Sequence, residues 1–226
     1  MKAKPKLLIF DVNETLLDLS LLKEKVNKLF GTTLAFEVWF SKLIQFAMVE
    51  TTTGTYSDFG DIGASTLHMT AQGFSKHLSE HDIKTTLSLM TQLQPHPEVL
   101  KSLAGLKENG FRLVALTNGG KATLAKQMKY SKLEPLFDKV YSVEEVKKFK
   151  PHPEPYHYVL REEKFTHSKA MMIAAHAWDI MGAKHIGLQT AFISRPGKFL
   201  YENTGKPDLV CNNLEELVKH LATHYN

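Results

Sequence analysis

Short apolar runs alternate with helical patterns in the second half of the chain, and helical patterns alone fill much of the first half. The run Leu7–Phe10 is apolar and is followed by a polar turn, as in a buried strand of a parallel sheet. Further strands are predicted at 111–116, 140–143, 171–175 and 191–194, and helices at 97–109, from 153 onward and at 212–223. Alternation of this kind is typical of an α/β fold.

Between the first strand and Gln94 the pattern is only helical. Val38, Trp39 and Leu43 follow a helical period, residues 51–56 interrupt it, and helices are predicted again at 57–75 and 79–92. Pro95 and the strands that follow mark the return to alternation. The sequence therefore predicts an α/β core that is interrupted by an all-helical insert at roughly 17–94.

Composition narrows the classes of protein that fit this pattern. The chain has 226 residues, 43% of them hydrophobic and 23% charged, which suits one core with a smaller insert. Its net charge of +4 is scattered apart from a short cluster at 147–150, so we expect no nucleic-acid partner. The single cysteine, Cys211, excludes an internal disulfide and a cysteine-based zinc site. Because the sequence shows no signal peptide and no run of ~20 apolar residues, we expect a cytoplasmic protein without a membrane partner.

Polar residues stand at the ends of the strand-like segments: Asp11, Thr117 with Asn118, Lys150, and His176 with Asp179. The carboxyl ends of parallel strands meet at one edge of a sheet, so these side chains can share a site. Asp11 would act as a nucleophile that forms an ester, and Lys150 would keep it ionised. Thr117 and Asn118 would donate hydrogen bonds to a substrate carboxylate or a developing anion. The alternative for Asp11 is a helix cap.

Four motifs built on these residues resemble motifs I to IV of the haloacid dehalogenase superfamily. They are Phe10-Asp11-x-x-x-Thr15-Leu16, Leu116-Thr117-Asn118-Gly119, Lys150-Pro151-x-Pro153-x-x-Tyr156 and Ala177-Trp178-Asp179, in that order. The L-2-haloacid dehalogenases (type II) are the most similar branch, since Trp39 and Tyr56-Ser57-Asp58-Phe59 resemble their helical cap. The resemblance implies a Rossmann-like core at 1–16 and 95–226, a cap at 17–94, and displacement of halide by an aspartate without a cofactor.

Most members of the superfamily are phosphatases, which have a second Asp two places after the nucleophile. Here that place is Asn13, which cannot act as a general acid or base. Halide needs no proton to leave, so Asn13 favours dehalogenation. In the phosphatase alternative, Asp11 and Asp179 would share Mg²⁺. A third alternative is a binding protein that keeps the fold without the chemistry.

The chain departs from the dehalogenase pattern at three places. Phe40 follows Trp39 where an arginine is usual, His176 replaces an asparagine (and Ala174 a serine), and Glu14 replaces a glycine. Histidine is well matched to deprotonating water near neutral pH. We hypothesise that His176 activates the water that opens the ester, and that Glu14, or else Asp18, orients its ring. The alternative is a core histidine beside a solvated glutamate.

For each of the other candidate residues, two interpretations of its role are open. Thr15 is a helix cap or a ligand-binding group, Tyr156 faces the site or packs at an interface, and Asp179 positions the water or fixes Lys150. Trp39 and Phe40 are core residues or part of the wall for a small 2-halocarboxylic acid, the expected substrate. A homodimer through cap helices is compatible with the resemblance, although no sequence feature requires it.

Overall fold

The computed structural model describes residues 3–223, and its centre is a parallel sheet. The strands are Leu7–Phe10 (β1), Arg112–Thr117 (β4), Lys139–Ser142 (β5), Ala170–Ala174 (β6), Gln189–Ile193 (β7) and Leu209–Cys211 (β8). Within the described part they form a six-stranded sheet in the order β5-β4-β1-β6-β7-β8, with every neighbouring pair parallel. All four residues of β1 are buried, which suits its place between β4 and β6.

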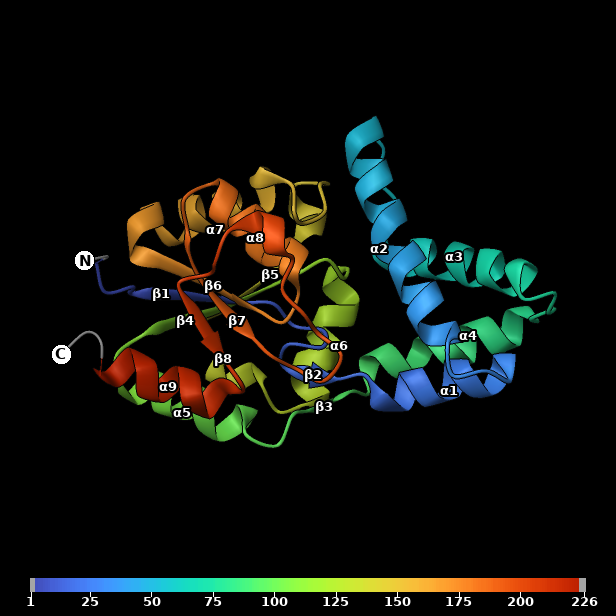
Figure 1. Ribbon diagram of the computed structural model, residues 1–226, viewed down its shortest axis with the longest axis horizontal. Helices are drawn as coiled ribbons and strands as arrows, with labels where there is room; N and C mark the ends of the chain where they lie inside the picture. Colours follow the sequence, from blue (N-terminus) through green and yellow to red (C-terminus); the bar gives the residue numbers. More distant parts are fainter. Residues whose placement is uncertain (1–2, 224–226) are drawn as a thin grey trace.

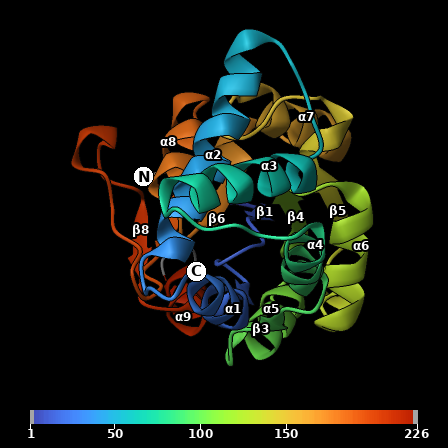
Figure 2. The same ribbon diagram turned by 90° about the vertical axis from the view of Figure 1, so that its right-hand side faces the viewer.

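Helices cover both faces of this sheet (Figure 1). Helices α7 (Pro153–Glu163) and α8 (Ala177–His185) lie on one face, and α5 (Val99–Glu108) and α9 (Leu214–Thr223) lie on the other. Figure 2 shows the same two layers from the side. Helix α6 (Lys121–Tyr130) follows β4. The α/β class expected from the sequence is confirmed.

The insert forms four α-helices beside the carboxyl ends of the strands (Figures 1 and 2). They are α1 (Ser20–Phe30), α2 (Ala35–Thr53), α3 (Phe59–Gly73) and α4 (Glu80–Ser88). The chain enters this region through β2 (Leu17–Asp18) and leaves it through β3 (Gln94–Pro95), and these two strands pair antiparallel. This pairing supports the division at 17 and 94, which stays a prediction.

Local signals in the sequence account for several ends of these helices. Helices α1 and α2 end at Gly31 and Gly54, whose φ angles of 67° and 78° lie in the left-handed region that glycine adopts without a steric penalty. Helix α4 begins with a capping box between Ser79 and Asp82. No helix follows the first turn directly, because β2 intervenes and α1 begins at Ser20. The reading of Thr15 as a helix cap is therefore wrong.

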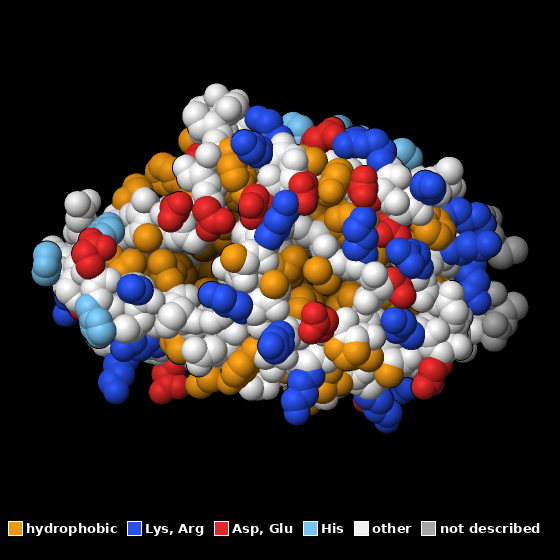
Figure 3. Space-filling model, turned by 180° about the vertical axis from the view of Figure 1, so that it is seen from behind, with side chains coloured by type: hydrophobic (Ala, Val, Ile, Leu, Met, Phe, Trp, Pro, Cys, Tyr) orange, Lys and Arg blue, Asp and Glu red, His pale blue; other side chains and the backbone are white. Residues whose placement is uncertain are grey.

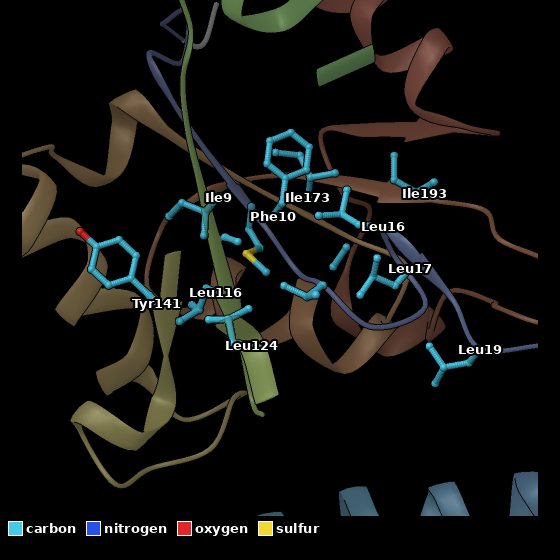
Figure 4. Close-up of a cluster of buried hydrophobic side chains, with 14 of the residues drawn as sticks. Ile9, Phe10, Leu16, Leu17, Leu19, Leu116, Leu124, Tyr141, Ile173 and Ile193 are labelled. Atoms are coloured by element: carbon cyan, nitrogen blue, oxygen red, sulfur yellow. The ribbon is translucent and has the colours of Figure 1, made fainter. Parts of the chain in front are cut away.

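The main hydrophobic core lies between β1 and its neighbours. Figure 4 shows Ile9 and Phe10 of β1 meeting Leu116 of β4, Ile173 of β6 and Leu16 of the first turn, all with no exposed surface. This packing fixes the carboxyl end of β1, which Asp11 directly follows. On the face shown in Figure 3, Lys and Arg side chains are interspersed with Asp and Glu. None of the helices in residues 3–223 has the length and apolar character needed to cross a membrane.

Candidate active site

Asp11 is the first residue after β1, and its carboxylate lies in a buried ion-pair network. Lys150 Nζ donates to Asp11 Oδ1 at 2.9 Å and to Asp179 Oδ2 at 2.6 Å. The Lys150 side chain has no exposed surface, and its ammonium also donates to the Leu116 carbonyl at 2.8 Å. Burial opposes ionisation of Asp11, but the charge of Lys150 and contacts with His176 and Thr15 outweigh it and lower its pKa. Asp11 is thus held as an anion.

The same network bears on whether Mg²⁺ fits between Asp11 and Asp179. The Lys150 ammonium already bridges the two carboxylates. The other oxygen of Asp179, Oδ1, accepts from the Tyr156 hydroxyl at 2.6 Å. Within residues 3–223, no group of three or more His, Cys, Asp or Glu side chains is arranged to hold a metal ion. The residues present do not fit a bridging magnesium ion.

His176 lies between two carboxylates, one at each ring nitrogen. Its Nδ1 is 3.1 Å from Asp11 Oδ2, and its Nε2 is 2.8 Å from Glu14 Oε2. Asp18, the alternative partner, instead accepts hydrogen bonds from the backbone and hydroxyl of Ser20. Glu14 is therefore the carboxylate placed to orient the imidazole.

The backbone of Glu14 explains why this position is unusual. Its φ of 61° lies in the left-handed region, where a side chain is strained and glycine is not. Such strain costs roughly 1–3 kcal/mol and persists where surrounding contacts fix the conformation. Here the Glu14 carboxylate contacts both His176 and Lys198, and these two contacts hold the backbone of Glu14 in its strained conformation.

The two carboxylates determine the charge of His176. Burial disfavours the imidazolium, but hydrogen bonds to Asp11 and Glu14 and their charges outweigh burial and raise its pKa to about 9. Both ring nitrogens can donate only in the protonated form. At neutral pH the resting site therefore holds His176 as a cation, which cannot accept a proton from water while Asp11 is ionised.

Two aromatic rings enclose the His176 ring. Trp178 is stacked on it with a centroid distance of 5.0 Å, and Phe40 of α2 is stacked at 6.4 Å. Phe40 thus brings the helical insert into contact with the catalytic candidate. The adjacent Trp39 is buried, and its indole donates to the Gly63 carbonyl at 2.9 Å. The contact with His176 places Phe40 at the boundary between insert and sheet, whereas the indole bond of Trp39 lies within the insert.

The remaining candidates support this network. The Thr15 hydroxyl donates to Asp11 Oδ2 at 2.7 Å and accepts from the backbone of Ala175 at 2.9 Å. Asn118 Oδ1 accepts from the backbone N–H of Lys150 at 2.8 Å.

Thr117 and Tyr156 also form bonds to neighbouring groups. Thr117 Oγ1 accepts from the backbone of Gly119 at 3.1 Å. Tyr156 is fully buried and reaches Asp179, so it faces the site. Whether Thr117 and Asn118 also donate to a substrate stays a prediction.

Two cavities of about 150 Å³ each lie beside the turn after β1. One is lined by Asn13, Trp39, Phe59 and Gly119 and is mostly apolar. The other is lined by both apolar and charged residues, the charged ones including Glu14, Lys23 and Lys198. The first offers space for a short carbon chain between the insert and the sheet.

Sequence reasoning missed two basic residues that lie after β7. Arg195 is buried, donates twice to the Thr15 carbonyl, and pairs with Glu98 at 2.8 Å. Lys198 pairs with Glu14 at 2.6 Å. The strand at 191–194 was predicted, so the rule that sites form at strand ends could have indicated both residues.

Comparison with known proteins identifies the class that this fold and site belong to. The sequence profile of the family "Haloacid dehalogenase-like hydrolase" matches residues 8–193. That match includes the whole insert and every candidate named from Asp11 to Asp179. The chain belongs to the haloacid dehalogenase-like hydrolase family.

Individual relatives extend over nearly the full chain. Haloacetate dehalogenase H-2 of Moraxella sp. (strain B) is 28% identical and covers 97% of this chain and 99% of its own. (S)-2-haloacid dehalogenase 2 of Pseudomonas sp. (strain CBS-3) is 24% identical, with 92% of both chains covered. The structure of L-2-haloacid dehalogenase from Xanthobacter autotrophicus superposes with a TM-score of 0.89 at 22% identity, over 97% of this chain and 99% of that one. The last comparison shows a shared fold.

Proposed function

We propose that this protein hydrolyses small L-2-haloacids to 2-hydroxy acids through an ester on Asp11. The observation that carries the proposal is the position of His176, with one ring nitrogen on Asp11 and the other on Glu14. Relatives that are named as dehalogenases of haloacetate and of (S)-2-haloacids support the substrate class.

In the first step the Asp11 carboxylate attacks the carbon that bears the halogen. A carbon–oxygen bond forms, the carbon–halogen bond breaks, and its electron pair leaves with the halide. Lys150 holds the carboxylate in place through its 2.9 Å contact. Phe40 stands where an arginine was expected, and its ring is stacked on His176. The His176 imidazolium therefore supplies a positive charge there, 3.1 Å from Asp11 Oδ2.

Esterification changes the state of His176. Esterification removes the charge of Asp11, while the ester keeps the carboxylate of the haloacid, so His176 loses one of the two side-chain carboxylates that raise its pKa. It then releases its proton, which accounts for the acid formed together with the halide. Glu14, still bonded to Nε2, leaves Nδ1 as the acceptor that faces the ester.

In the second step neutral His176 takes a proton from water as the water attacks the acyl carbon of Asp11. The bond between that carbon and the alkoxide oxygen breaks, and the alkoxide takes the proton back from His176. The second proton of the water, now on the Asp11 carboxyl group, passes to His176 Nδ1, which regenerates the Asp11 carboxylate and the imidazolium. The overall reaction consumes a haloacid and water and gives a hydroxy acid, halide and a proton.

The phosphatase alternative finds less support in the geometry. Asn13, which occupies the place of the second aspartate, accepts a hydrogen bond from Gln127 at 2.9 Å. The ammonium of Lys150 lies between the two carboxylates that would bind Mg²⁺.

The test is halide release from monobromoacetate and from each enantiomer of 2-bromopropionate, with a generic phosphate ester and Mg²⁺ run in parallel. We expect halide release that disappears in Asp11→Ala, with preference for the L enantiomer. Phosphate release without halide release would favour the phosphatase, and neither signal would favour a binding protein.

A further inference from the structure

Lys198, in the loop after β7, contacts Glu14. Its ammonium lies 2.6 Å from Glu14 Oε2, the same oxygen that contacts His176 Nε2 at 2.8 Å. The Lys198 side chain is 17% exposed, so this ion pair is largely shielded from solvent. The ammonium also lies 5.7 Å from the centre of the Phe40 ring. Lys198 thus touches both the residue that orients His176 and the ring that covers it.

The local backbone holds Lys198 in this place. Residues 195–198 form a turn in which the Lys198 N–H donates to the Arg195 carbonyl at 2.9 Å. Pro196 and Gly197 occupy its centre, and Gly197 has a φ of 76°, as the third residue of a type II turn requires. Arg195 anchors the turn through its bonds to the Thr15 carbonyl and Glu98. A surface lysine on a free loop would not be fixed in this way.

The contact between Lys198 and Glu14 affects the balance of charges in the site. In the resting enzyme three carboxylates (Asp11, Glu14 and Asp179) face three cations: Lys150, His176 and Lys198. When Asp11 becomes an ester, two carboxylates of the protein remain, and the ester carries the carboxylate of the haloacid. Lys150 balances Asp179, and Lys198 balances Glu14. The charges of the protein's own side chains are then balanced without a proton on His176.

We propose that Lys198 is a positioning residue for ester hydrolysis: it holds Glu14 and neutralises it, so that His176 can act as a base once Asp11 is esterified. This inference rests on the proposed function and adds a residue to its second step. Without Lys198, Glu14 would be balanced by the imidazolium, which would keep its proton. The first step, in which His176 is a cation in any case, would be affected little.

Other charged groups near the pair have their own partners. Lys23 pairs with Glu37 and Asp18 accepts from Ser20. His96 contacts the Glu14 carbonyl rather than its carboxylate. Among the described residues, the ion-pair network contains Asp11, Lys150 and Asp179, and the charged or titratable groups that line the cavity beside Glu14 are Asp18, Lys23, Glu37, His96, Arg195 and Lys198.

The substitution Lys198→Met removes the charge of the side chain and keeps its length, whereas Lys198→Arg keeps the charge. The control is Lys23→Met, which removes a charge from the same cavity without altering a contact of Glu14. With monobromoacetate, we expect bromide release in the first turnover to change less than threefold in Lys198→Met. Glycolate formation at pH 7 should fall about tenfold, with ester accumulating, and its pH profile should move up by about one unit. Lys198→Arg and Lys23→Met should resemble the wild type. An unchanged profile, or an equal loss in both steps, would overturn the proposal.

A second measurement needs no substrate. Asp11→Asn removes the carboxylate charge as the ester does, and NMR titration then reports the pKa of His176. We expect this pKa to be higher by about one unit in Asp11→Asn/Lys198→Met than in Asp11→Asn alone. Equal values would overturn the inference even if the wild type releases halide. If the wild type releases no halide from any haloacid while the shift is seen, the proposed function fails and the electrostatic role of Lys198 stands.

Discussion

His176 couples the protonation of the site to the stability of the fold. Its ring is 7% exposed and lies between Asp11 and Glu14, which favour the imidazolium. Its folded-state pKa of about 9 lies above the ordinary value of 6.5. A raised pKa contributes stability that is fully present below the unfolded value and is lost as pH rises through the folded value.

We therefore expect the free energy of unfolding to fall between pH 6.5 and pH 9.5 by about 3 kcal/mol more in the wild type than in His176→Asn. The asparagine variant keeps the other titrating groups and removes this one. Urea unfolding at the two pH values measures the difference. An identical pH dependence in both proteins would show that His176 is not held as a cation.

Helix α8 depends on one small residue to approach the site. A Cβ on Gly182 would lie 2.6 Å from Pro151 Cβ and 2.7 Å from both the Pro151 carbonyl and the Tyr156 hydroxyl. The helix can therefore lie against the segment after Lys150, where Tyr156 reaches Asp179. Glycine at this position allows the contact that fixes the Lys150–Asp179 pair.

The substitution Gly182→Ala should push α8 away from Pro151, with a cost of roughly 1–3 kcal/mol in unfolding free energy and a loss of halide release. Gly105→Ala in α5 is the matched control, because a Cβ there meets nothing within 4 Å. That control should stabilise the protein by up to about 1 kcal/mol with unchanged activity. Equal effects of the two substitutions on stability and turnover would contradict this account of α8.

At the scale of elements, long periodic segments were predictable and short ones were not. The central strand, the helical insert and the strands at β4, β5, β6 and β7 follow from apolar runs and helical periods. Strands β2, β3 and β8 span two or three residues, which is too short for a period to show. Their position is determined by pairing with distant strands, as Leu17 pairs with Pro95.

In the folded protein, residues that are far apart in the sequence lie in one site. Asp11 and Lys150 could be assigned to one site because each belongs to a motif, and His176 because it follows β6 at a motif position where asparagine is usual. The contact of Phe40 with His176 could not be predicted from the sequence, since it depends on how α2 lies over the edge of the sheet. The same holds for Lys198, whose partner Glu14 is remote in sequence.

Contact between insert and sheet predicts a measurable role for the Phe40 ring. Phe40→Leu keeps an apolar side chain but removes the stacking on His176 and the cation contact with Lys198. We expect kcat/KM for haloacid to fall by about three- to tenfold, since such contacts are worth about 1 kcal/mol. Phe74→Leu is the control, because Phe74 pairs with Phe30 inside the insert. A loss of similar size in the control would assign the effect to packing of the insert.

The central claim is that Asp11 forms an ester that His176 resolves, and mass spectrometry of His176→Asn incubated with monobromoacetate tests it most directly. We expect one carboxymethyl group on the tryptic peptide 7–23, localised to Asp11, that persists in the variant and turns over in the wild type. Fragmentation distinguishes Asp11 from Glu14 and Asp18 in the same peptide. A label on another residue, or turnover in the variant equal to that of the wild type with no ester, would contradict the account.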